Sequence, residues 1–327
     1  MNSMINKNVI KVFIDKSNVI RRYASSLSSS SSISSSSSSS SSLSYKEAQN
    51  DGKLSFHKRP LPDNLISLSS VQGKRLFKEA LELGGMESFF ALSEQFTTQS
   101  EPSFCALSSL AMVLNALNFD PKKTWKGSWR WVSEETLQCE TTECGHSLDK
   151  VKRDGMDFNE FESLARCHSV GIKSQRLSSE LSSNNLIELH EFRNRIINIS
   201  TSANSDAFIV VNFSRKSLGQ TGDGHFSPIG GYHAEKDLVL IMDVARFKYP
   251  PFWVSLTSLW NSMIVQDGKT KMSRGYFLIF NQDNGNINID ITDRVHHNHN
   301  HDHSHSHDHS HSHSHDHHHN GCNHVSK

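Results

Sequence analysis

Two low-complexity segments restrict where this chain of 327 residues can fold. Between Ser25 and Ser44, seventeen of twenty residues are serine, and a tract with so few apolar side chains cannot build a core. From His296 to His324, fifteen of the chain's twenty-one histidines alternate mainly with Asp, Ser and Asn. The remaining stretch of about 230 residues is long enough for one domain with a hydrophobic core. We therefore expect an N-terminal extension over residues 1–53, a folded domain over 54–282 and a His-rich tail over 283–327.

The charge of the chain is balanced, with 34 basic and 34 acidic residues and no long basic block, so we expect no nucleic-acid partner. No apolar run approaches the ~18 residues that a membrane-spanning helix needs, so we expect no membrane partner either. The five cysteines are few and odd in number, and no secretory signal is evident. This usage is typical of a reducing, intracellular compartment.

Residues 1–23 resemble a mitochondrial presequence. The segment is amphipathic, basic and poor in acids, and it runs into the serine tract through the sequence RRYASS. An untargeted extension is the alternative interpretation, because such patterns are loose. Cytoplasmic and mitochondrial locations therefore both remain open.

Helical periodicity dominates the first part of the folded region and strand patterns dominate the second. The helical patterns cover residues 68–83, 86–96, 102–117, 160–170 and 186–196. Short β-rich runs follow at 207–213, 225–233, 238–244 and 276–280. Helices followed by an antiparallel sheet predict an α+β fold with two lobes, an N-terminal helical lobe and a C-terminal sheet lobe.

The segment QSEPSFCALSSLAMVLNAL, residues 99–117, places a thiol at the head of the third helix. Proline is tolerated in the first helical turn, so Pro102 predicts a helix start at residues 101–103 with Cys105 in its first turn. Unpaired N–H groups and the helix dipole at that end favour an anion, and the thiolate is the nucleophilic form of cysteine. Cys105 also lies off the apolar stripe of this helix. The alternative is a small buried side chain.

A catalytic thiol needs a base and a group that orients the base. His225 begins one predicted strand, and Asp243 lies near the end of the next. A hairpin with the five-residue loop 233–237 would set Tyr232 opposite Leu238 and bring His225 within reach of Asp243. A loop one residue shorter or longer would put them on opposite faces, unless a bulge corrected the register.

Two alternatives remain for this pair. His233 competes as the base, although it lies at the turn end of its strand. Asp243, inside an apolar strand, could form a structural ion pair with Arg246 instead. Six residues before the thiol, the side-chain amide of Gln99 is a candidate donor to an oxyanion, together with the backbone N–H of Cys105. The order Gln–Cys–His–Asp, on a helix and then a sheet, is that of papain-like thiol enzymes.

Several segments together resemble phytochelatin synthase, also called glutathione γ-glutamylcysteinyltransferase. They are QSEPSFCALSSLAMVLNALNFDP, WKGSWRWVSEETL, QTGDGHFSPIGGYH and DVARFKYPPFWV. The resemblance runs from about residue 56 to residue 280 and implies a papain-like fold. It implies a triad of Cys105, His225 and Asp243, with Gln99 as the oxyanion-hole glutamine.

The resemblance also implies a reaction. Cys105 attacks the Cys–Gly peptide of glutathione, glycine leaves, and the γ-glutamylcysteinyl group passes to a second glutathione or a growing phytochelatin. It implies no cofactor in the active site, and Cd, Zn or Cu ions as activators in the form of metal–glutathione thiolates. We also allow for a homodimer. The alternatives are a glutathione deglycinase that only hydrolyses and a metal-storage protein built around the His-rich tail.

Three departures from the family pattern concern residue 106 and two metal-binding regions. Ala106 stands where a glycine is usual after the nucleophile, and the cysteine-rich C-terminal half of plant members is replaced by the His-rich tail. The stretch QCETTECGH holds Cys139 and Cys144, whose spacing is loose for a zinc site. Imidazoles in the tail can chelate metal ions without a fold. We take as candidate ligands His296, His297, His299, His301, His303 and His305.

The two glutathiones carry carboxylates and amines, so charged residues near the motifs are candidate substrate ligands. On charge alone we select Glu101 and Arg246, with Lys248 as a further candidate.

Overall fold

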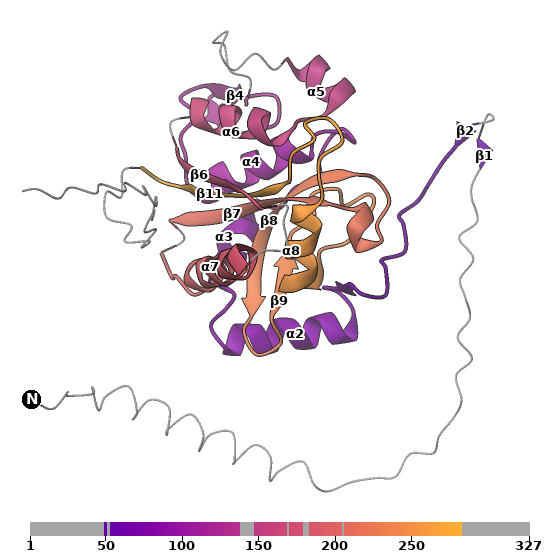
Figure 1. The fold of residues 1–327 in the computed structure, drawn as a ribbon. Helices are drawn as coiled ribbons and strands as arrows, with labels where there is room; N and C mark the ends of the chain where they lie inside the picture. The colour runs from indigo at the N-terminus through magenta and orange to yellow at the C-terminus, as the bar shows by residue number, and fades with distance from the viewer. Residues whose placement is uncertain are drawn as a thin grey trace, which may run out of the picture. The chain divides into compact units, whose positions relative to one another are not determined.

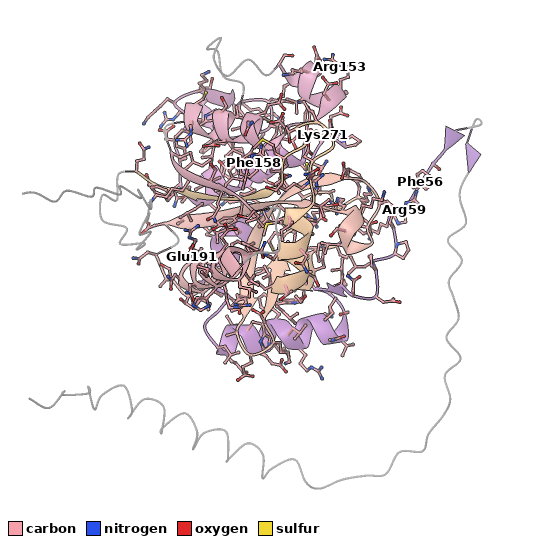
Figure 2. The ribbon with its side chains drawn as sticks, in the orientation of Figure 1. Phe56, Arg59, Arg153, Phe158, Glu191 and Lys271 are labelled. Atoms are coloured by element: carbon pink, nitrogen blue, oxygen red, sulfur yellow. The ribbon has the colours of Figure 1, made fainter. Side chains whose placement is uncertain are left out.

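The computed structural model describes residues 49–50, 53–137, 147–168, 170–178, 183–204 and 206–282. The chain divides into two units, residues 1–59 and 60–327. The described part of the first unit holds a small hairpin of β1 (Gln49–Asn50) and β2 (Lys53–Leu54). After it, the guanidinium of Arg59 lies 3.9 Å from the ring centroid of Phe56 (Figure 2). The predicted domain boundaries at residues 53 and 282 stay predictions.

The second unit contains seven described α-helices, one short 3₁₀ helix and the remaining strands (Figure 1). The helices are α2 (Val71–Glu82), α3 (Glu87–Glu94), α4 (Cys105–Ala116), α5 (Leu148–Asp154), α6 (Phe158–Cys167), α7 (Ser183–Ser200), η1 (Lys216–Leu218) and α8 (Leu256–Ile264). The strands are β3 (Ile66–Ser67), β4 (Thr124–Lys126), β5 (Trp129–Arg130), β6 (Gly171–Arg176), β7 (Ala207–Ser214), β8 (Gly224–His233), β9 (Leu238–Ile241), β10 (Phe252–Ser255) and β11 (Gly275–Phe280).

Seven of these strands form one sheet in the order β3-β10-β9-β8-β7-β11-β6, and every neighbouring pair is antiparallel. The α+β class predicted from the sequence is confirmed, and the architecture is consistent with a papain-like fold. The separation of helices and strands along the chain is less strict than predicted, because β3 and β6 come from the helical part. The central strands β8 and β7 carry buried side chains on both faces, so the sheet lies inside the molecule.

Two hydrophobic clusters cover the two faces of the sheet. Alternation along β7 directs Phe208 and Val210 to the cluster of α4 and α6, and Ile209 and Val211 to the cluster of α7 and α8. Figure 1 shows these helix pairs on opposite sides of the sheet. On α7 the exposed Glu191 points to solvent (Figure 2), while the adjacent Phe192 is fully buried.

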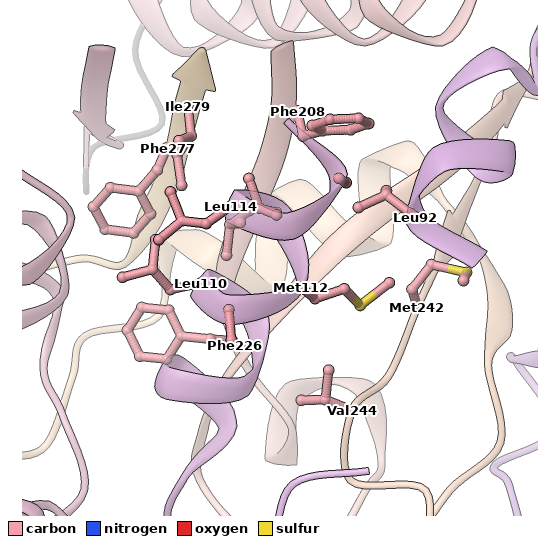
Figure 3. Packing of buried hydrophobic residues seen from close by; sticks show 14 of the residues in the cluster. Leu92, Leu110, Met112, Leu114, Phe208, Phe226, Met242, Val244, Phe277 and Ile279 are labelled. Carbon is pink, nitrogen blue, oxygen red and sulfur yellow. The ribbon is translucent and has the colours of Figure 1, made fainter. Parts of the chain in front are cut away.

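Helix α4 lies at the centre of the first cluster. Its side chains Leu110 and Leu114 face the aromatic rings of the sheet, and Met112 faces Met242 (Figure 3). All of its residues are buried except Cys105 and Asn115. The side of the helix next to Cys105 is therefore buried as well as the apolar stripe, so the helix is enclosed all round.

The hydroxyl groups on this helix are satisfied internally. Ser109 donates to the carbonyl of Phe226 on β8 at 3.1 Å, and Ser108 donates to the carboxylate of Glu134. Buried hydroxyls with such partners cost little, which is why serines are tolerated on an enclosed face.

The β8–β9 hairpin differs from the predicted register and then returns to it. His233 pairs with Leu238 and Tyr232 with Val239, one residue off the predicted pairing, so the loop has one residue fewer than predicted. A bulge between Ile229 and Gly231 then adds one residue to β8. Beyond the bulge, Ile229 pairs with Ile241, which is the register that the predicted loop would have produced. The bulge is therefore what brings His225 and Asp243 to the same face.

The bulge needs glycine where β8 passes close to the segment after α2. A Cβ atom on Gly231 would lie 2.4 Å from the sulfur of Met86 and 3.0 Å from the carbonyl oxygen of Gly85. We predict that Gly231→Ala lowers the free energy of unfolding by about 1–3 kcal/mol, because the side chains around it must shift.

Urea unfolding measures this loss. The matched control is Gly268→Ala, where the nearest atom, Asp223 Oδ2, is 3.7 Å from the added Cβ. Equal unfolding free energies for the two variants would show that the close approach at the bulge is not a constraint.

Candidate active site

A cavity of about 380 Å³ opens between the helical layer and one end of the sheet. One wall comes from the turn before α4 and the segment joining α5 to α6, and the other from the ends of β7 and β8 with two loops. Its lining includes Pro102, Ser103, Cys105, Asp154, Asp157, Asn212, Arg215, Asp223, His225, Phe226, Phe247, Lys248, Asp267 and Lys269. Cys105 and His225 thus line one cavity, although they are 120 positions apart in the chain.

The thiol lies at the first residue of α4. Residues 101–104 form a turn, with the N–H of Phe104 bonded to the carbonyl of Glu101 at 3.0 Å, so the helix begins later than predicted. Backbone N–H groups of Ala106 and Phe226 interact with the sulfur and favour its anionic form. Because Phe226 directly follows His225, this contact brings the strand that carries His225 to the thiol, and both side chains line the same cavity.

The imidazole of His225 is held by a buried carboxylate. His225 Nε2 lies 3.0 Å from Asp243 Oδ1 and 3.0 Å from the hydroxyl of Ser227. The carboxylate accepts from the imidazole, so the proton belongs on Nε2 and Nδ1 is the nitrogen left to act as a base. Asp243 lies two residues after the end of β9, where its Oδ1 also accepts the N–H of Ala245 at 2.9 Å.

Asp243 has a second partner that sequence reasoning missed. The guanidinium of Arg215, after β7, lies 2.9 Å from each carboxylate oxygen, and both side chains are almost fully buried. Arg215 also donates to Gln220 Oε1 at 2.6 Å. The structural partner suggested for this carboxylate, Arg246, is exposed and lies over the ring of Phe96, 4.7 Å from its centroid.

These contacts decide the protonation states of the site. Although burial opposes it, the charges of His225 and Arg215 hold the pKa of Asp243 well below its usual range. Burial, together with the charge of Arg215, lowers the pKa of His225 to about 4. Burial raises the pKa of the Cys105 thiol above its ordinary value, against the two N–H contacts.

The expectation that the helix terminus eases thiol ionisation is therefore wrong in its net direction. Near pH 7 the site holds an ionised Asp243, a neutral His225 and a protonated Cys105. Such a site can perform nucleophilic catalysis with the imidazole as general base.

Gln99 lies in the turn that leads into α4. Its backbone N–H donates to Val244 at 3.0 Å, next to Asp243, and its Nε2 donates to the carbonyls of Glu101 and Pro102 at 2.8 and 2.9 Å. To stabilise an oxyanion, an N–H of the Gln99 side-chain amide would have to be shared between these carbonyls and the substrate. This role of Gln99 stays a prediction.

Comparison with known proteins places this chain in a family. The model of the phytochelatin synthase family matches residues 56–276. The chain belongs to the phytochelatin synthase family.

The similar proteins are longer than the matched region. The chain is 46% identical over 226 residues to glutathione gamma-glutamylcysteinyltransferase 1 of Triticum aestivum, covering 69% of this chain and 42% of that protein. It is 47% identical over 224 residues to the Lotus japonicus protein of the same name, covering 68% and 42%. It is 42% identical over 233 residues to the Schizosaccharomyces pombe glutathione gamma-glutamylcysteinyltransferase, covering 71% and 53%. The match thus spans about half the length of these relatives.

In this phytochelatin synthase family member, the two charge-based substrate candidates make contacts outside the cavity lining. Glu101 forms an ion pair with Lys152 of α5, and Arg246 packs on Phe96. Neither side chain belongs to the cavity lining, whereas Lys248 does. The substrate roles of Glu101 and Arg246 stay predictions.

The other histidine of β8 has a different environment. His233 is fully buried and its Nε2 lies 3.1 Å from a carboxylate oxygen of Glu79 on α2. It links α2 to the hairpin and does not line the cavity.

The predicted metal ligands Cys139 and Cys144, and the six histidines of the tail, lie outside the described residues. Within the described ranges, no group of three or more His, Cys, Asp or Glu side chains could hold a metal ion. Cys167, the last residue of α6, is disulfide-bonded. The helices described here include none long and apolar enough to cross a membrane.

The buried ion pair generates a prediction for this family member. Arg215→Ala leaves Asp243 buried without its cation, and we expect the free energy of unfolding in urea to fall by about 3–5 kcal/mol.

Arg246→Ala is the matched control. It removes an exposed guanidinium that only contacts an aromatic ring, so it should cost no more than about 1 kcal/mol. If the two variants unfold with the same free energy, Arg215 does not stabilise the buried carboxylate.

Proposed function

We propose that this chain is a γ-glutamylcysteine dipeptidyl transferase that makes phytochelatins from glutathione, with Cys105 as nucleophile, His225 as base and Asp243 as the orienting group. The observation that carries the proposal is the 3.0 Å contact of His225 with Asp243 beside a thiol at the head of a helix. Membership in the phytochelatin synthase family and the names of the relatives support the substrate.

In the first half-reaction, the sulfur of Cys105 attacks the carbonyl carbon of the Cys–Gly peptide of glutathione. His225 Nδ1 takes the thiol proton as the carbon–sulfur bond forms, and Asp243 stabilises the resulting imidazolium. When the intermediate collapses, the imidazolium gives that proton to the amine of glycine, which leaves. The γ-glutamylcysteinyl group remains on Cys105 as a thioester.

In the second half-reaction, the α-amine of another glutathione or of a phytochelatin attacks the thioester. His225, neutral again, accepts the proton of that amine and returns it to the sulfur as the new peptide forms. Water in place of the amine would release γ-glutamylcysteine, which is the hydrolytic alternative. The oxyanion of either step lies near the N–H groups of the first turn of α4 and, in this proposal, near Gln99.

The charges of the cavity suit a peptide with two carboxylates and one ammonium group. Lys248 and Lys269 line it on the sheet side, and four acidic side chains line it as well. Lys269 also bridges the two walls, 3.2 Å from Asp157 and 3.1 Å from Glu160 of α6. We assign Lys248 to a substrate carboxylate, in preference to Arg246, because it faces the cavity.

We further propose, from the family resemblance, that Cd, Zn and Cu ions stimulate the transfer as glutathione thiolates that act as the acceptor. The metal ion then arrives with the substrate. A homodimer and a cytoplasmic or mitochondrial location remain proposals of the same kind.

Two buried histidines on one strand offer a matched test of the mechanism. With glutathione and Cd²⁺, we expect the wild-type protein to release glycine and form peptides longer than glutathione, measured by mass spectrometry. Cys105→Ala and His225→Asn should lose both products, because each removes a group that forms or breaks bonds.

His233→Asn is the control and should retain both activities, with folding of each variant checked by circular dichroism. An active Cys105→Ala protein would falsify the proposal. Formation of γ-glutamylcysteine with no longer peptide would favour the deglycinase.

A further inference from the structure

The β4–β5 hairpin lies on the helical side of the sheet, where Figure 1 shows β4 close to α6. Its strands pair with each other and with no other described strand. They are joined by Gly127 and Ser128, and Gly127 has a φ of 55°, which suits a tight hairpin turn. Every residue from 122 to 131 is exposed, so this segment adds nothing to the core.

Three tryptophans are gathered here, two on the hairpin and one on the residue that directly follows it. Trp125, Trp129 and Trp131 are 38%, 75% and 42% exposed, whereas the other two tryptophans, Trp253 and Trp260, are buried. Large aromatic side chains gathered on a solvent-exposed element are typical of an interaction surface. The exposed tryptophans of the motif WKGSWRW therefore have no role in the proposed reaction.

The same segment is strongly cationic. Residues 122–131 contain Lys122, Lys123, Lys126 and Arg130 and no acid. Asp120 pairs with Lys122 at 3.1 Å and with Arg130 at 2.8 Å, so residues 120–131 carry four positive charges against one negative. The ammonium of Lys126 lies over the ring of Trp125, 4.4 Å from its centroid.

The base of the hairpin is fixed to α4. Asn115 near the C-terminal end of that helix exchanges hydrogen bonds with the backbone of Val132, at 2.8 and 3.2 Å. Ten residues of helix rise, roughly 15 Å, separate this anchor from Cys105 at the other end. A partner on the hairpin therefore leaves the active-site cavity open.

We propose that the β4–β5 hairpin docks this protein on the surface of membranes that contain anionic phospholipid. Tryptophan is enriched at the membrane–water interface, where its ring lies among the headgroups and its N–H stays hydrated. Lysine and arginine are attracted to the negative surface of such a leaflet. Three of the four cations are lysines, which are depleted in protein–protein interfaces, so the composition favours a lipid surface over a protein partner.

This peripheral contact requires no membrane-spanning helix. It departs from the expectation that a membrane is not a partner, because that expectation rested on the absence of a long apolar run. The sequence could not reveal that three tryptophans share an exposed hairpin.

The test uses the full-length protein and vesicles of phosphatidylcholine with about 30% phosphatidylserine, which give the membrane surface a negative charge. We expect co-sedimentation with these vesicles and a blue shift of tryptophan emission. Both should be lost in 0.5 M NaCl, because the Debye length is then only a few ångströms, and with pure phosphatidylcholine, which carries no net negative charge.

Two hairpin variants should bind at least about tenfold more weakly, Trp129→Ala through loss of the interfacial ring and Lys126→Glu through charge reversal. Phe90→Ala, which removes a half-exposed ring from α3, is the matched control and should bind as the wild type does. All variants should release glycine from glutathione at the wild-type rate without vesicles.

The proposal is overturned if the wild-type protein does not bind the anionic vesicles, or if Trp129→Ala binds them unchanged. Binding of a single-stranded DNA oligonucleotide through the same residues, without vesicle binding, would assign the hairpin to a different partner and also overturn it.

Discussion

The site depends on the contacts that the buried carboxylate of Asp243 makes on both sides. It lies between the guanidinium of Arg215 and the imidazole of His225, with contacts of 2.9 and 3.0 Å. An isolated charge at this depth would be prohibitively costly, so Arg215 is what allows Asp243 to remain ionised inside the sheet. The ionised carboxylate in turn fixes the tautomer and the orientation of His225, so Arg215 positions the imidazole through Asp243.

The enclosure of α4 sets the other half of the chemistry. A helix buried on all sides holds Cys105 at a defined place, and the bond from Ser109 to Phe226 ties that helix to the strand carrying the base. The same burial keeps the thiol protonated and the imidazole neutral at rest. This resting state differs from a preformed thiolate–imidazolium pair, and in the proposed mechanism the proton moves only when the substrate is attacked.

Residue types and periodicity were sufficient to predict the α+β class and the helix that carries Cys105. They also indicated that His225 lies within reach of Asp243, as the structure has it, while the catalytic roles of the three residues stay proposals. The hairpin register was one residue off at the turn, because no pattern in the sequence encodes the bulge near Gly230. Arg215 was missed because an arginine after a buried strand looks like a surface residue, and its partner is 28 positions away. The short helices α5 and α8 and the strands β3, β6 and β10 escaped detection, since their apolar patterns are brief and depend on the sheet that they complete.

The resting protonation state of the Cys105–His225 pair is tested most directly by the pH dependence of Cys105 alkylation with iodoacetamide, followed by peptide mapping and corrected with Cys105→Ala. The pKa of the thiol lies above its ordinary value and that of His225 falls to about 4, so the reactive thiolate is scarce near neutrality. The rate should therefore be low at pH 7 and climb only above about pH 9. A rate that already levels off near pH 5 would reveal a thiolate–imidazolium pair and contradict the account.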